Sequence, residues 1–175
     1  MSEYTSKMYL NIQIFYIDGE EVARWYYNPD GTIKKEGKKI DGTVRMHSEK
    51  GGLLSEITYK NNELNGHYLL FSENGLLEEE GYFKKNELDG NFRQYNENGT
   101  IKIDGRYKNG KREGIFKLYY PSGIIEEEEN YKNGVIDGEV KNYTENGRIE
   151  TKTFYKKGKL LKIIYYDQDG KIKKE

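Results

Sequence analysis

A chain of 175 residues that is 34% hydrophobic and 34% charged has too few apolar side chains for a thick core between two layers. Aromatic residues make up 14% of it, led by 17 tyrosines, which is too many for a disordered chain. Lysine and arginine (29) nearly balance aspartate and glutamate (30), so no overall field favours nucleic acid or an anionic membrane. The absence of cysteine excludes disulfides, thiolate catalysis and cysteine-based zinc sites.

The N-terminal stretch alternates apolar and polar residues over Tyr9–Ile17, which is the pattern of a half-buried strand. We expect an edge strand here, within a capping segment at residues 8–18, and a turn at Asp18–Gly19 that leads into the aromatic run at 25–27. The first twenty residues lack the basic start and the continuous apolar run of a signal peptide. No window is long and apolar enough to span a membrane. We therefore expect a cytoplasmic protein.

The rest of the chain repeats itself every 24 residues. The stretch YKNGKREG at Tyr107–Gly114 returns as YKNGVIDG at Tyr131–Gly138, and it occurs earlier as FKKNELDG and YKNNELNG. Two glycine columns keep the same interval: Gly42, Gly66, Gly90, Gly114 and Gly138, and Gly51, Gly75, Gly99, Gly123 and Gly147. A fixed period of this length is typical of stacked repeats, each of which buries its apolar face against the next.

Each repeat contains two short β-prone runs separated by turn signals. Asn–Gly suits the positive φ angles of a type I′ hairpin turn. It occurs at Asn74, Asn98, Asn109, Asn133 and Asn146. We predict an all-β fold, an elongated single-layer antiparallel meander of 24-residue hairpins that forms one repeat domain over residues 1–175. The hairpin repeats span about residues 19–161, and a capping hairpin spans residues 162–175.

Aromatic side chains form a column four residues before the second glycine of each repeat. The regular part of this column is Phe71, Tyr95, Tyr119 and Tyr143. If its face is exposed, the column is a contiguous aromatic patch of the kind that binds other proteins. The alternative is that it only holds the sheet together as a ladder of cross-strand pairs. Alternation also predicts one shared face for Ile101, Ile103, Gly105 and Tyr107.

Carboxylates gather just after the second glycine column, at Glu78–Glu80 and again at Glu126, Glu127, Glu128 and Glu129. Such a run on a β-strip is usually solvated, and cross-strand lysines such as Lys102 can pair with it. The alternative is an acidic patch that recognises a basic partner. The second run is therefore included, with the aromatic column, in the candidate binding surface.

No motif for catalysis, metal binding or phosphate binding is present in the sequence. The glycines recur at turn spacing, and the two histidines lack the spacing of metal ligands. His47 replaces an aromatic residue in its column, which indicates a structural role, and His67 follows a turn glycine. We therefore expect no catalytic residue, no metal, no cofactor and no enzymatic activity.

The repeated YKNGKREG, followed by YYPSG, resembles the MORN repeat (membrane occupation and recognition nexus) over roughly residues 19–172. It most closely resembles the variant bacterial form, which is found in small proteins described as antitoxins of toxin–antitoxin pairs. The standard unit has glycine two positions after its closing glycine, and this chain instead has Val44, Tyr68, Phe92, Phe116 and Val140. The histidine before the closing glycine is replaced as well, by Asp41, Asn65, Asp89, Glu113 and Asp137. These differences argue against the lipid binding proposed for standard arrays.

The resemblance implies a non-enzymatic β-hairpin strip that binds another protein along its extended face, as an antitoxin or immunity-type protein binds a toxin. It implies neither a nucleic acid nor a membrane as the partner. The alternative is a structural scaffold or self-associating array, in which copies of the chain join as a homo-oligomer through sheet edges.

Overall fold

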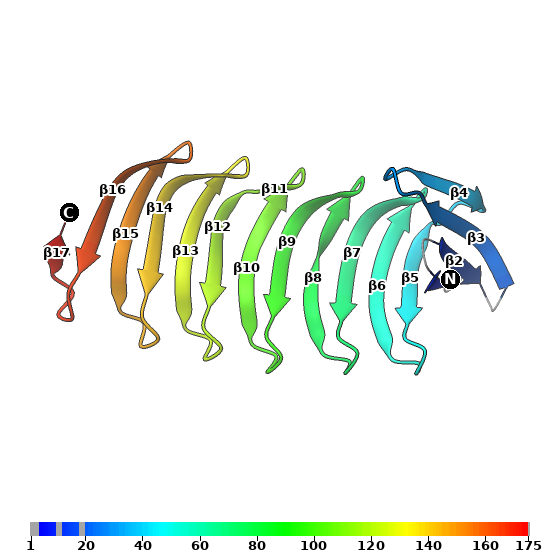
Figure 1. Ribbon diagram of the computed structural model, residues 1–175, viewed down its shortest axis with the longest axis horizontal. Helices are drawn as coiled ribbons and strands as arrows, with labels where there is room; N and C mark the ends of the chain where they lie inside the picture. Colours follow the sequence, from blue (N-terminus) through cyan, green and yellow to red (C-terminus); the bar gives the residue numbers. More distant parts are fainter. Residues whose placement is uncertain (1–3, 10–11, 18–19, 175) are drawn as a thin grey trace. The chain divides into compact units, whose positions relative to one another are not determined.

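The computed structural model of the chain describes residues 4–9, 12–17 and 20–174, and these ranges contain strands and turns but no helix. The predicted all-β fold of consecutive antiparallel hairpins is confirmed (Figure 1). The chain divides into two compact units, Met1–Glu87 and Leu88–Glu175, which we call the first and the second unit.

The described residues of the first unit form eight strands. They are β1 Tyr4–Tyr9, β2 Ile12–Ile17, β3 Glu20–Tyr27, β4 Ile33–Gly37, β5 Gly42–His47, β6 Leu53–Lys60, β7 Glu63–Phe71 and β8 Leu77–Lys84. Their spatial order is β4, β3, β2, β1, β5, β6, β7, β8. Because β1 pairs with β5 in parallel, one parallel pair interrupts the antiparallel meander.

The prediction of an edge strand at Tyr9–Ile17 is wrong, because β2 pairs with β1 on one side and with β3 on the other. Residues 10–11 and 18 of the predicted capping segment lie outside the described residues. The inner position of β2 is explained by its side chains. Phe15 is fully buried, and an edge strand would leave this large ring in water.

A small core fills the first unit. Phe15 on β2, Trp25 on β3 and Tyr59 on β6 form a triangle of rings whose centroids lie 4.6 to 6.1 Å apart. In a flat sheet β3 and β6 would be about 19 Å apart, since four strand spacings of about 4.8 Å separate them. The sheet therefore curls until β2 and β3 face β6, and this unit has a second layer that the predicted single-layer strip lacks.

The second unit is an antiparallel meander. Its strands are β9 Glu87–Tyr95, β10 Ile101–Lys108, β11 Lys111–Arg112, β12 Gly114–Tyr119, β13 Ile125–Lys132, β14 Val135–Tyr143, β15 Ile149–Lys156, β16 Lys159–Tyr166 and β17 Ile172–Lys174. Within this unit the main strands β9, β10, β12, β13, β14, β15, β16 and β17 pair in chain order, and the two-residue β11 pairs with the end of β10.

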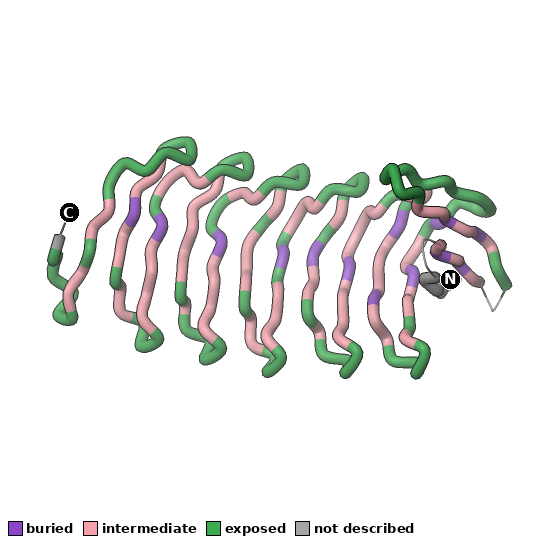
Figure 2. The backbone as a smooth tube through the Cα atoms, in the orientation of Figure 1, coloured by how far each residue is buried: buried purple, intermediate pink, exposed green. Residues whose placement is uncertain are grey.

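The largest side chain fully buried in this single layer is a ring that lies on a glycine of the neighbouring strand. Figure 2 shows the buried residues as isolated positions along the strands. Phe116 is fully buried, and a Cβ added to Gly105 on the neighbouring strand would meet its ring at 2.5 Å. In the first unit the ring of Tyr68 lies in the same way on Gly81, at 2.8 Å. One column, two residues after the closing glycine, is buried in all five repeats: Val44, Tyr68, Phe92, Phe116 and Val140.

The Asn–Gly turns fall into two kinds. Asn109–Gly110 and Asn133–Gly134 have positive φ at both residues, as a type I′ turn requires. At Gly75, Gly99 and Gly147 only the glycine has positive φ, and its N–H donates to the carbonyl three residues earlier. These three turns are a type I turn followed by a left-handed glycine, so the type I′ prediction is wrong for them.

We expect Gly105→Ala to destabilise the protein by about 1–3 kcal/mol, because the new methyl group would overlap the buried ring of Phe116. The free energy of unfolding, measured by urea denaturation, checks this. The control is Gly52→Ala, where a Cβ meets nothing closer than 3.4 Å. A Gly105→Ala variant that is as stable as the wild type would show that the ring does not rest on this glycine.

Candidate binding face

The second unit has two side-chain faces. Along β9, β12 and β14 a buried residue of the column described above is followed three positions later by a tyrosine. Residues three apart on a strand point to opposite sides of the sheet. We call the side with Phe92, Phe116 and Val140 the aromatic face, and the side with Tyr95, Tyr119 and Tyr143 the tyrosine face.

The aromatic face is a ladder of rings. Tyr107 contacts Phe92 and Phe116, and Phe116 contacts Tyr131, with centroids 5.2 to 5.4 Å apart and edge-to-face geometry. Arg112 covers the end of this ladder: its guanidinium carbon lies 4.8 Å from the Phe116 ring centre and 5.2 Å from that of Tyr131. These contacts hold the strands together, so the aromatic face is mainly structural.

Tyr131 and Arg112 also bind Glu129 on this face. The Tyr131 hydroxyl donates to Oε2 of Glu129 at 3.0 Å and accepts from Nη1 of Arg112 at 2.9 Å. The Arg112 guanidinium lies 3.6 Å from the same carboxylate. Burial of the phenol, opposed by the hydrogen bond from Arg112, raises the pKa of Tyr131.

The tyrosine face carries a row of tyrosine–isoleucine pairs, one in each of three successive hairpins. The pairs are Tyr95 with Ile101, Tyr119 with Ile125 and Tyr143 with Ile149. A β-bulge after each isoleucine turns it to the tyrosine face. The predicted common face of Ile101, Ile103, Gly105 and Tyr107 is therefore wrong for Ile101. All six side chains of this row, which we call the Tyr–Ile row, are half-buried.

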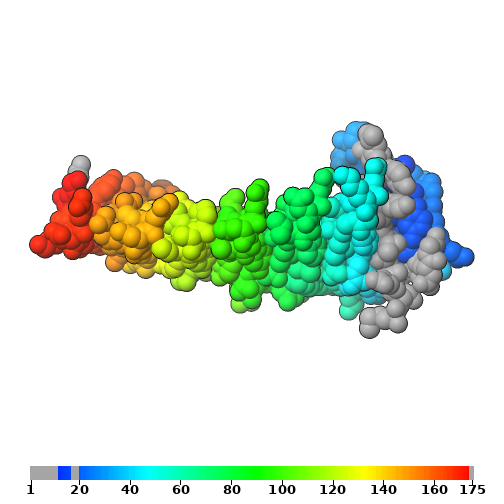
Figure 3. Space-filling model, turned by 90° about the horizontal axis from the view of Figure 1, so that it is seen from below, coloured from blue at the N-terminus to red at the C-terminus, as the bar shows by residue number. Residues whose placement is uncertain are grey.

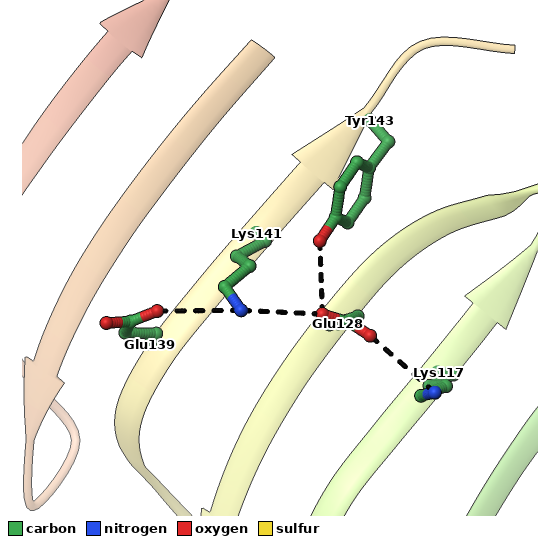
Figure 4. Close-up of polar contacts among 5 residues, drawn as sticks. All are labelled: Lys117, Glu128, Glu139, Lys141 and Tyr143. Carbon is green, nitrogen blue, oxygen red and sulfur yellow. Dashed lines mark hydrogen bonds and ion pairs between the residues drawn. The ribbon is translucent and has the colours of Figure 1, made fainter. Parts of the chain in front are cut away.

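Charged residues of alternating sign run beside the Tyr–Ile row. Arg93 pairs with Asp104 at 2.8 Å. Further along, Glu128 lies between Lys117 and Lys141, at 3.7 and 3.6 Å, and also accepts a hydrogen bond from the Tyr143 hydroxyl at 3.1 Å (Figure 4). With Glu139, which lies 3.6 Å from Lys141, these contacts balance the charges, and the hydrogen bond to Glu128 fixes the ring of Tyr143.

The candidate acidic patch Glu126–Glu129 is divided by the sheet. Glu128 lies on the tyrosine face, Glu127 and Glu129 lie on the aromatic face, and Glu126 is the exposed bulge residue near the turn. Four carboxylates of this run therefore do not form one patch. Cross-strand lysines do pair with the run, but they are Lys117 and Lys141 in place of Lys102.

Three of the four predicted aromatic residues share the Tyr–Ile row, and Phe71 belongs to the first unit. There it is half-buried on β7, paired with Leu77, three residues after the buried Tyr68. Sequence reasoning missed Arg112 and the role of the buried column. The signal for the column was present, because an apolar residue recurs two positions after each closing glycine.

Neither metal ligands nor a membrane span is found in the described part of the chain. His, Asp and Glu side chains nowhere gather there in a group of three or more that could hold a metal ion. Nor does any described segment form a helix of the length and hydrophobicity needed to cross a bilayer.

These features define a repeat protein built from antiparallel β-hairpins, in which rings on one face brace each hairpin against the next. The MORN repeat variant family matches residues 40–61, 88–109, 112–133, 136–157 and 149–168, together more than half of the chain. The chain therefore belongs to the MORN repeat variant family. MORN repeats are in general modules that bind proteins or membranes. A search of curated proteins finds no match to the chain.

We expect Glu127→Gln to stabilise the protein at neutral pH. Burial, then repulsion from Glu129 and Glu126, raises the pKa of Glu127. A carboxyl whose pKa is higher in the folded state stabilises the fold below the unfolded pKa, and this contribution is lost as the pH rises through the folded pKa. Glutamine stays neutral throughout, so the gain should vanish below about pH 4.3, the ordinary glutamate value.

The measurement is the urea midpoint of the variant and the wild type across this pH range. The control is Glu97→Gln, because Glu97 is exposed and forms no ion pair among the described residues. A Glu127→Gln variant that is no more stable than the wild type at neutral pH would contradict the expected burial of a charged carboxylate.

Proposed function

We propose that this protein is a non-enzymatic protein-binding module that holds its partner along the tyrosine face of the second unit. The observation that carries the proposal is the Tyr–Ile row, which presents a tyrosine and an isoleucine from each of three successive hairpins on one side of the sheet. Rows of this kind allow a partner to make the same contact several times.

The chemistry of the row suits a protein partner. Tyrosine is enriched at interface hot spots because it offers a large ring, few rotatable bonds and a hydroxyl group. The Tyr143 ring is already fixed by its hydrogen bond to Glu128, so little rotamer entropy remains to be lost on binding. The neighbouring charges are paired among themselves and would form a polar rim.

The finer part of the proposal is an antitoxin or immunity-type role, in which the partner is a toxin and the tyrosine face covers its active surface. This part is supported by the resemblance of the repeats to the variant MORN arrays of such proteins. The alternative function is a structural scaffold or self-associating array, which the repetitive hairpins would serve equally well.

We expect the double substitution Tyr119→Ser and Tyr143→Ser to weaken partner binding by about 30-fold or more, since one hot-spot tyrosine is worth about 2 kcal/mol. The tagged full-length chain is used to capture its partner from native lysate, and the affinity for the purified partner is then measured by calorimetry. The matched control is Tyr82→Ser with Tyr165→Ser, two exposed tyrosines outside the row. Equal losses in both double variants would overturn the assignment of the tyrosine face.

The antitoxin role has its own test. We expect the captured partner to arrest growth when it is expressed alone, and the full-length chain to restore growth when it is co-expressed. A partner without toxicity would remove the antitoxin role and leave the binding function intact.

A further inference from the structure

The hairpin turns of the second unit lie along two opposite edges of its sheet. The turns after β10, β13 and β15 are on one edge, and those after β9, β12, β14 and β16 are on the other (Figure 1). The first of these edges carries five exposed lysines, which we call the lysine edge: Lys108, Lys111, Lys132, Lys157 and Lys159. None of the five forms an ion pair with any other described residue.

Three acidic side chains near the lysine edge are already engaged. Asp89 accepts a hydrogen bond from the backbone N–H of Asn109 at 3.1 Å, and Glu113 accepts one from Asn133 at 2.7 Å. Asp137 pairs with Lys156 at 3.2 Å. Each carboxylate thus braces a turn or binds another lysine, and the five ammonium groups of the lysine edge remain open to a partner.

The opposite edge is acidic. Five exposed carboxylates lie in or just after its turns, and none of them forms an ion pair in the described part of the chain. We call this edge the acidic edge, and its five carboxylates are Glu97, Glu126, Glu145, Glu150 and Asp169. Figure 3 looks onto this edge and shows its hairpins side by side in chain order. Burial, together with the negative charges of Glu126, Glu150 and Glu145, raises the pKa of Tyr120.

The acidic edge also carries cations at its ends. Lys102 is exposed near its first turn, and Lys171 and Lys173 are exposed beside its last. Arg148 lies in the turn after β14, where its guanidinium donates to the backbone carbonyl of Gln168 at 3.2 Å. Three of the five unpaired carboxylates, Glu126, Glu145 and Glu150, belong to the two middle turns, so carboxylates outnumber cations there.

The two edges match each other in spacing. On both, charges recur at least once per hairpin, and successive hairpins are two strands apart, or about 10 Å. An isolated surface ion pair contributes little free energy, so a docking surface of this kind needs several ion pairs at once. Two copies of this chain can form several together, because their repeats have the same period and the charges of one copy stay aligned with those of the other.

We propose that the lysine edge of the second unit binds the acidic edge of a second copy of this chain, side by side and in repeat register. The contact is heterologous, so a pair of copies keeps one free edge of each sign and the assembly can grow further. Exposed apolar side chains on the lysine edge, Val135 (46%), Leu160 (54%) and Leu161 (65%), add surface that such a contact would cover. This assembly leaves the tyrosine face free and does not depend on the proposed function.

A second copy fits this edge better than a nucleic acid does. The chain has a net charge of −1, and the same unit that carries the lysines also carries the opposed carboxylates, which would repel a phosphate backbone. For a second copy, the same carboxylates are the binding partner.

The test is the size of the full-length chain in solution, measured by sedimentation velocity over a range of protein concentrations. We expect concentration-dependent association at about 0.01 M salt, and dissociation at about 1 M salt, where the Debye length falls from about 30 Å to about 3 Å. The apparent dissociation constant should rise at least about tenfold between the two conditions. A chain that stays monomeric at low salt, or whose association resists high salt, would overturn the proposal.

Charge-reversal variants identify the edges. Lysine reversal (Lys108→Glu, Lys132→Glu, Lys159→Glu) and acid reversal (Glu126→Lys, Glu145→Lys, Glu150→Lys) should each abolish self-association. An equimolar mixture of the two variants should associate again, because one then has two acidic edges and the other two basic edges. The control Lys38→Glu, Lys39→Glu, Lys50→Glu changes the net charge equally in exposed loops of the first unit and should associate as the wild type does.

Three results would contradict the proposal. Association that persists in either reversed variant would place the contact elsewhere on the chain. A mixture that stays monomeric would rule out edge-to-edge complementarity. Wild-type chain that remains monomeric but binds a polyphosphate probe, with loss of this binding on lysine reversal, would assign the lysine edge to a polyanion. Circular dichroism of each variant verifies that the sheet is retained.

Discussion

The second unit depends on one packing constraint: a single-layer sheet must bury its large side chains without a second layer to cover them. It meets this constraint by packing large side chains against neighbouring strands of the same sheet. The ring of Phe116 lies on Gly105 of the neighbouring strand, and Tyr107 and Tyr131 stand at its edges. Burial in such a sheet is therefore a contact between adjacent hairpins, and the hairpins are stabilised mainly by their neighbours in the manner of repeat proteins.

Side-chain size follows from this constraint. The position that holds Gly105 is occupied by Gly81 one repeat earlier and by Glu129 one repeat later. Where it is glycine, a large ring can lie on the backbone, as Phe116 and Tyr68 do. Beside Glu129 the buried residue is the smaller Val140, and the carboxylate is held by Arg112 and Tyr131. The first unit follows a different rule at its start, where the curled sheet brings Trp25 onto Tyr59 and forms a true core.

Because the side chains of the aromatic face contact one another within the sheet, the tyrosine face and the two turn edges are the surfaces that remain for a partner. On the tyrosine face the charges of Lys117, Glu128, Lys141 and Glu139 balance one another next to the Tyr–Ile row. Charges without partners are instead found at the turns, positive on one edge and negative on the other. A chain whose net charge is close to zero can thus have strongly charged edges, because its composition says nothing about how the charges are distributed.

The sequence by itself determined the repeat length, the hairpins, their antiparallel pairing and the type I′ turns at Asn109 and Asn133, because these follow from local φ preferences and a fixed period. Only the tertiary structure decided which side chains share a face. A bulge changes the alternation by one residue, so Ile101 joined Tyr95 and the run Glu126–Glu129 was divided. The sequence shows the apolar column as a recurring position, but the neighbours that bury it, like the parallel β1–β5 pair, are set by strands whose placement local patterns do not specify.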